Sequence, residues 1–204
     1  MTIDGTNLID SILESLSRID YIKTADIPNI DLYMDQVTTF MESKLRPSTR
    51  NPQDDKILTK TMINNYTKND LLPPPVKKKY SKEHVLLLIF IYYFKGVLSI
   101  NDIQALLQPL TTKYFQGEAA LTLEDIYNEV FSLEAAQVEK LCEDVRKQYE
   151  KAFETFPAVD EEEKEFLQKF SFICMLSFDV YVKKLLIEKL IDELPAAQVD
   201  KKEK

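Results

Sequence analysis

Apolar residues recur at helical spacing along most of the chain, and this pattern predicts its helices. Residues 7–19 carry apolar side chains at every third or fourth position from Leu8 to Ile19, which predicts an amphipathic helix. Six further stretches have the same spacing: about residues 31–45, 58–68, 81–94, 100–107, 122–156 and 160–194. The fifth is either continuous or interrupted near Ser132. The expected fold class is therefore mainly α.

The most apolar of these stretches predicts the centre of a core. Ser81 is its capping residue, Glu83 lies in its first turn, and all ten residues of Val85–Phe94 are apolar or aromatic. A helix that is apolar on all sides is normally buried among other elements. This is also the longest apolar run in the chain, and a bilayer span needs about 20 residues, so we expect no membrane anchor.

Two proline-containing stretches predict exposed connections. Residues Arg46–Asp55 include two prolines and no apolar side chain, so they do not belong to a buried element. Residues Leu71–Tyr80 include three consecutive prolines and three consecutive lysines. This composition predicts an extended hairpin with a solvated tip.

The helical pattern is lost between Gln108 and Ala120, where Pro109 and Gly117 fall, and we expect a domain boundary there. The sequence thus predicts an N-terminal domain over residues 1–110, a helical C-terminal domain over 111–195 and a disordered polar tail over 196–204. The C-terminal domain is expected to mediate dimerisation or to sense a signal.

Charge is distributed unevenly along the chain. The formal net charge of the 204 residues is −8, which by itself argues against a polyanionic partner. Residues 44–82, however, hold ten basic and three acidic side chains, a local charge of +7, and the remainder must then carry −15. Such a basic segment either forms a surface for nucleic acid or is simply a set of solvated faces.

The order of elements between residues 31 and 107 is that of a winged helix-turn-helix: a helix, a linker, a short polar helix, a hairpin and an apolar helix. On the short helix, Lys60, Asn64 and Lys68 form a stripe at four-residue spacing, with Thr61 and Asn65 beside it. Asparagine suits an adenine edge, and lysine suits phosphate or guanine. The alternative is that these are ordinary surface polar residues.

Three stretches of the chain resemble, in order, the DNA-binding domain of MerR-type bacterial transcription regulators. In that family a recognition helix ends in Tyr and a Gly-Leu-Leu-Pro turn, a wing leads into Tyr-Ser, and a Gly-Phe-Ser-Leu-x-Glu-Ile helix follows. The corresponding residues here are Tyr66 with Asp70-Leu71-Leu72-Pro73, then Tyr80-Ser81, then Gly96-Val97-Leu98-Ser99-Ile100. The whole chain is also similar to an uncharacterised family of low-GC Gram-positive bacterial proteins, a domain of unknown function.

The MerR resemblance implies a recognition helix and a short wing that contact DNA. Together with the polar stripe it gives eleven candidate DNA-binding residues: Lys60, Thr61, Asn64, Asn65, Tyr66, Lys68, Lys77, Lys78, Lys79, Tyr80 and Lys82. The chain departs from the family in having Asn64 in place of the usual arginine and Asp70 in place of the turn glycine. Aspartate is tolerated in the left-handed backbone conformation that such a turn uses.

Few residues suggest catalytic or metal chemistry. The single histidine, His84, has no evident partner nucleophile or carboxylate, so a role at the helix start is favoured over that of a general base. Cys142 and Cys174 lack the spacing of zinc ligands, and we expect free, buried thiols. The three glycines are isolated and cannot form a phosphate-binding loop. We therefore expect no enzyme activity, no cofactor and no metal.

These observations lead to the expectation of a cytoplasmic bacterial transcription regulator, with a repressor as the favoured direction. It is expected to bind double-stranded DNA as a homodimer, because the last helices have more apolar positions than one helix pair requires. The positions are Phe166, Phe170, Ile173, Leu185 and Leu190. The alternative is a helical protein-interaction module whose winged helix domain no longer binds DNA.

Overall fold

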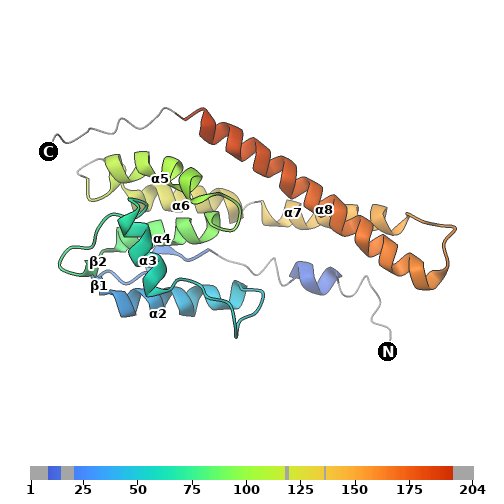
Figure 1. Cartoon of the computed structure of the whole chain (residues 1–204), viewed down its shortest axis with the longest axis horizontal. Helices are drawn as coiled ribbons and strands as arrows, with labels where there is room; N and C mark the ends of the chain where they lie inside the picture. The colour runs from blue at the N-terminus through green and yellow to red at the C-terminus, as the bar shows by residue number, and fades with distance from the viewer. Residues whose placement is uncertain (1–8, 15–20, 118–119, 136, 195–204) are drawn as a thin grey trace. The chain divides into compact units, whose positions relative to one another are not determined.

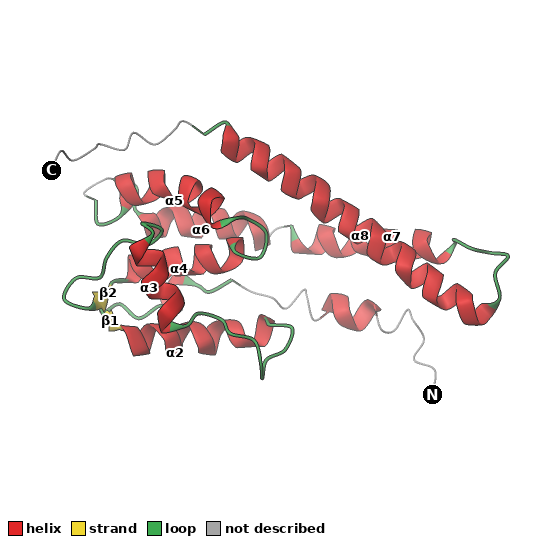
Figure 2. Cartoon of the chain, in the orientation of Figure 1, coloured by secondary structure: helices red, strands yellow, loops and turns green. Residues whose placement is uncertain are grey.

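The computed structural model describes residues 9–14, 21–117, 120–135 and 137–194. Within these residues the chain forms seven helices labelled α2 to α8, a further helical segment at 9–14 and a two-stranded antiparallel sheet (Figures 1 and 2). The helices are α2 (Met34–Leu45), α3 (Lys60–Lys68), α4 (Lys82–Phe94), α5 (Ile100–Tyr114), α6 (Leu123–Ala135), α7 (Val138–Phe153) and α8 (Glu161–Asp192). The strands are β1 (Leu32–Tyr33) and β2 (Lys79–Tyr80), and short 3-10 helices lie at Thr24–Asp26 and Arg46–Ser48. The mainly α prediction is confirmed, and no helix of the described ranges has the length and apolarity of a membrane span.

The chain divides into two compact units. Of the described residues, one unit contains 22–117, 120–130 and 188–194, and the other contains 9–14, 21, 131–135 and 137–187. The boundary expected after residue 110 differs from this division, because residue 110 lies inside α5. The expected tail and most of the expected first helix outside 9–14 fall beyond the described residues.

Helix α4 is the centre of the larger unit, as its apolar sequence predicts. The eight residues from His84 to Ile91 are each at most 4% exposed. Full burial of a large apolar side chain stabilises a fold by roughly 1.5–3 kcal/mol, and seven such side chains follow one another here. The other elements of the unit therefore pack around this helix.

The small sheet joins the hairpin to the start of α2. Leu32 pairs with Tyr80 and Tyr33 with Lys79 in antiparallel register. The expected helix start at residue 31 was wrong, since β1 occupies these positions and α2 begins at Met34. The backbone N–H of Tyr33 donates to Gln36 Oε1 at 2.8 Å, which caps α2 directly after the strand.

Helix α5 continues through Pro109 to Tyr114, so the expected loss of helix at residue 108 was also wrong. One proline removes only one backbone donor, and Ile103 and Leu107 hold the helix by full burial of their side chains. The two caps that the sequence predicts nearby are confirmed. The Ser99 hydroxyl donates to the Asp102 carboxylate at 2.7 Å, and the equivalent bond at the start of α6 is also 2.7 Å.

In the smaller unit, residues 9–14 pack with α7 and α8. Ile9, Leu13, Ala152 and Phe172 form the buried cluster there. Both cysteines are free, as expected, but the prediction that both are buried was wrong because Cys174 is exposed and Cys142 is half-buried. Apolar positions surround much of α8, so the sequence pattern alone does not tell which of its faces is covered.

Candidate nucleic-acid interface

Helix α3 is fixed at both ends and along one side. Its N-cap is Thr59, whose hydroxyl accepts from the Met62 N–H at 3.2 Å, and Ile63 is fully buried. Helix α3 ends at Lys68, and in the turn that follows, Asp70 has a φ of 55°, the left-handed conformation that the sequence predicts there. Here the Leu71 N–H donates to the Tyr66 carbonyl at 2.9 Å, a bond typical of a helix C-terminus.

The opposite side of α3 is polar and open to solvent. Five of the candidate residues are exposed on it: Lys60, Thr61, Asn64, Asn65 and Lys68. With its side chains an α-helix is about 10–12 Å across, which fits a DNA major groove about 12 Å wide. The stripe predicted from the sequence is therefore presented outward.

The hairpin that follows α3 turns at two lysines. Val76 and Lys79 exchange both backbone hydrogen bonds, at 3.1 and 2.9 Å. Between them Lys77 and Lys78 have φ of 48° and 65°. Two successive left-handed residues make the tight turn that Asn-Gly usually occupies. For residues other than glycine this conformation costs roughly 1–2 kcal/mol each, and both side chains are exposed.

The lysines of this region differ in what they contact. Lys60 forms an ion pair with Asp35 at the start of α2, and Lys82 Nζ lies 2.7 Å from Glu124 Oε1 on α6. For Lys68, Lys77 and Lys78, the described part of the chain offers no acidic group within salt-bridge distance. These three are the cations best placed to meet an external anion.

The remaining candidates lie elsewhere. Tyr80 is 3% exposed, and Tyr66 is half-buried, so burial raises the pKa of both phenols. Lys79 Nζ sits 5.3 Å from the centre of the Tyr33 ring, across the small sheet. We therefore define the α3–turn surface as the seven exposed residues Lys60, Thr61, Asn64, Asn65, Lys68, Lys77 and Lys78.

Asp35 and Arg46 make contacts in this region that the sequence did not predict. Asp35 was not singled out, yet its carboxylate neutralises Lys60, and no local sequence signal links positions 25 residues apart. Arg46 was counted in the basic segment, but its guanidinium donates to the carbonyls of Pro52 and Asp55, the latter at 2.9 Å. It thereby folds the loop 46–55, which is mostly exposed as predicted.

Most of the larger unit matches the sequence model of a known protein family. The sequence model of a family described as a domain of unknown function, DUF1836, matches residues 22–130, more than half of the chain. The chain belongs to the DUF1836 family. This confirms, for residues 22–130, the expected likeness to a family of unknown function. Neither the curated proteins nor the solved structures gave a match, so no named homologue supports the MerR-like likeness.

His84 links the hairpin of the DUF1836 domain to α4. The Ser81 N–H donates to His84 Nδ1 at 3.0 Å, which caps α4 directly after β2. Nδ1 is thus an acceptor, and the imidazole proton lies on Nε2. The ring is 1% exposed and packs edge-on against Tyr80 and Phe115, with centroid separations of 5.4 and 4.7 Å. The structure therefore supports the predicted role of His84 at the helix start.

This burial makes the stability of the DUF1836 domain depend on pH. Burial lowers the pKa of the His84 imidazole, and the carbonyls of Pro74 and Pro73 oppose this more weakly. The unfolded chain takes up a proton near pH 6.5, whereas folded His84 does so only at lower pH. The free energy of unfolding should therefore be full above about pH 6.5 and fall below it, by up to about 1.4 kcal/mol per pH unit.

Urea denaturation between pH 7.5 and 5 measures this dependence. His84→Gln keeps a side-chain acceptor for the Ser81 N–H but does not titrate, so the variant should have nearly constant stability over this interval. His84 is the only histidine of the chain. A dependence that persists in the variant would assign the titration to another group.

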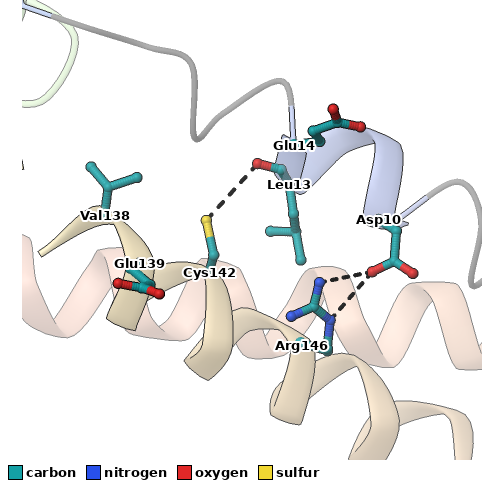
Figure 3. A pocket seen from close by; sticks show the side chains of 7 residues that line it. All are labelled: Asp10, Leu13, Glu14, Val138, Glu139, Cys142 and Arg146. Carbon is teal, nitrogen blue, oxygen red and sulfur yellow. Dashed lines mark hydrogen bonds and ion pairs between the residues drawn. The ribbon is translucent and has the colours of Figure 1, made fainter.

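A hollow lies in the smaller unit, between residues 9–14 and α7 (Figure 3). Its volume is about 530 Å³. Asp10 and Arg146 point toward each other across it, with 2.9 Å between Arg146 Nη2 and Asp10 Oδ1. Cys142 Sγ lies 3.9 Å from the Leu13 carbonyl. Because these groups contact one another, and no cluster of metal ligands occurs among the described residues, the candidate site remains the α3–turn surface.

Proposed function

We propose that this protein is a transcription regulator that binds duplex DNA through the α3–turn surface. The observation that carries the proposal is the pair Lys77 and Lys78, which are held exposed, without an acidic partner in the described residues, in a strained turn next to the open face of α3. Strained backbone that persists in a folded protein often marks a functional position.

The arrangement of elements supports a MerR-like winged helix. A strand, two helices, a hairpin and a central helix follow one another in the DUF1836 domain, and β1 pairs with the hairpin strand. In a winged helix-turn-helix the second helix enters the major groove. Here this is α3, and the turn at Lys77 and Lys78 forms the tip of a short wing.

Different residues of the surface would supply affinity and sequence choice. Lys68, Lys77 and Lys78 would neutralise backbone phosphates and release counterions, which favours any duplex. Asn64 and Asn65 can each make bidentate bonds to an adenine edge, which favours particular sequences. Such a regulator works in the cytoplasm and pairs two DNA-binding units in a homodimer.

Two observations favour a second candidate function, a protein-interaction module that has lost DNA binding. Asp35 neutralises Lys60 on the face that would meet DNA, and Asn64 stands where the MerR-type helix has an arginine. A protein partner with a basic or an apolar surface could then dock on the acidic C-terminal part of the chain, whose net charge is negative.

Fluorescence anisotropy of the whole chain with labelled duplexes tests the proposal. Fragments enriched from the genome of the source organism are titrated at salt concentrations between 50 and 200 mM. Three phosphate contacts predict that log K falls against log salt with a slope of roughly −3. Enriched fragments should bind more tightly than scrambled duplexes of the same length.

The matched control replaces Lys140 and Lys147 of α7, which are exposed but lie outside the α3–turn surface, with alanine. Their loss should leave affinity and slope unchanged. Salt-sensitive binding without sequence preference would contradict sequence-specific regulation and leave the second candidate function open. A folded chain that binds no duplex at 50 mM salt would overturn the regulator and favour the second candidate function.

A further inference from the structure

Helix α8 has an exposed apolar seam beside the face that packs on α7, and Ile173 at the lateral edge of this seam also lines a small hollow with Tyr149 and Phe153 of α7. The residues that face α7 and the 9–14 segment are buried or half-buried, among them Phe172, Met175 and Leu176. A different set recurs at alternating steps of four and three residues: Phe166, Phe170, Ile173, Ser177, Val180 and Lys184. This is the spacing with which one helix packs along another in a coiled coil.

Exposed apolar side chains make up most of this seam. Its four apolar members, Phe166, Phe170, Ile173 and Val180, are 54–68% exposed, and Tyr181 beside them is 58% exposed. At on the order of 100 Å² each, these five side chains expose about 500 Å², which is as large as the largest apolar patch of a typical monomer. Pairing with a second helix would remove this surface from water.

The charge of α8 changes sign along its length. Residues 161–165 hold four glutamates and one lysine, whereas residues 183–189 hold three lysines and one glutamate. Two such helices side by side in parallel would bring glutamates against glutamates. In antiparallel pairing, the acidic end of each helix lies beside the basic segment of the other, which is favourable.

The seam also determines a register. Aligned antiparallel, its six positions are all matched when Phe166 lies opposite Lys184 of the second helix, Phe170 opposite Val180, and Ile173 opposite Ser177. Tyr181, the residue after Val180, then flanks the contact on one side and widens it. The lysine stem can lie over the phenylalanine ring, a contact that adds cation–π attraction to apolar packing.

We propose that α8 pairs antiparallel with α8 of a second copy of this chain, in that register. This inference rests on the proposed function, and it specifies which helix forms the homodimer and in which direction the two copies pair. It is tested without DNA, so its failure and that of DNA binding are separate results.

Sedimentation equilibrium of the whole chain at 1–100 μM gives the first test. The mass should be twice that of one chain, and Ile173→Glu at the middle of the seam should weaken dimerisation by about 100-fold or more. The matched control is Leu141→Glu, an exposed leucine of α7 outside the seam (53% exposed), which should remain dimeric. Circular dichroism checks that each variant is folded.

Disulfide crosslinking tests direction and register. In a background with Cys142→Ser and Cys174→Ser, Phe170→Cys and Val180→Cys chains are oxidised separately and as a mixture. The antiparallel register predicts crosslinked dimers only in the mixture. Crosslinking of either variant with itself would indicate parallel pairing and overturn the proposal. So would a monomer at 100 μM or an Ile173→Glu chain that stays dimeric.

Discussion

Replacing Lys77 with asparagine and Lys78 with glycine should weaken binding to every DNA duplex while it stabilises the DUF1836 domain. Both lysines occupy left-handed positions, with φ of 48° and 65°, where asparagine and glycine are the preferred residues. Relief of this strain should raise the free energy of unfolding by about 1 kcal/mol. The same change removes two of the ammonium groups that we place against phosphates.

The loss of affinity can be estimated from counterion release. Two lost phosphate contacts should weaken binding roughly 10- to 100-fold near 0.1 M salt and make the slope of log K against log salt shallower by about 1.8. Anisotropy titrations measure the affinity, and urea denaturation measures the stability. An unchanged slope would show that the turn does not contact the backbone.

A variant with Lys77→Ala and Lys78→Ala separates charge from backbone conformation. Alanine is no more favourable than lysine in the left-handed region, so its stability should stay near that of the parent chain. Its affinity should fall as far as that of the asparagine–glycine variant. If only the latter lost affinity, the shape of the turn rather than its charge would be responsible.

Local signals in the sequence account for the features that it predicts well. A cap needs only two residues three positions apart, which is why Ser99 with Asp102 and Thr122 with Asp125 could be identified. The burial of α4 follows from its uninterrupted apolar composition. The exposed polar face of α3 follows from the four-residue spacing of Lys60, Asn64 and Lys68 in the same way.

Features that depend on distant partners could not be predicted. Strand β1 has two residues, too few for an alternating pattern, and it exists because Leu32 meets Tyr80, 48 residues later in the chain. That same pairing turns the Tyr80 side chain inward, away from the candidate surface. The left-handed turn at Lys77 and Lys78 carries none of the glycine or asparagine that normally announces it.

Replacing Ile63 with alanine should cost the fold about 2–5 kcal/mol, although this side chain cannot touch DNA. Ile63 is fully buried on the inner side of α3, and truncation there both removes apolar contact and leaves a cavity. Urea denaturation should show a lower midpoint with the same dependence of unfolding free energy on denaturant. Where the variant is still folded, its DNA affinity should match that of the parent chain.

The neighbouring change Asn64→Ala should leave stability nearly unchanged and weaken the preference for particular DNA sequences. Asn64 is exposed, so stability should change by less than about 0.5 kcal/mol. Loss of a bidentate contact to a base should cut the preference for enriched over scrambled duplexes by roughly 5- to 100-fold, since such a contact contributes about 1–3 kcal/mol. A pair of variants one residue apart thus separates the two sides of α3. If Asn64→Ala left the preference intact while Ile63→Ala changed it in the folded chain, α3 would not be the helix that reads the sequence.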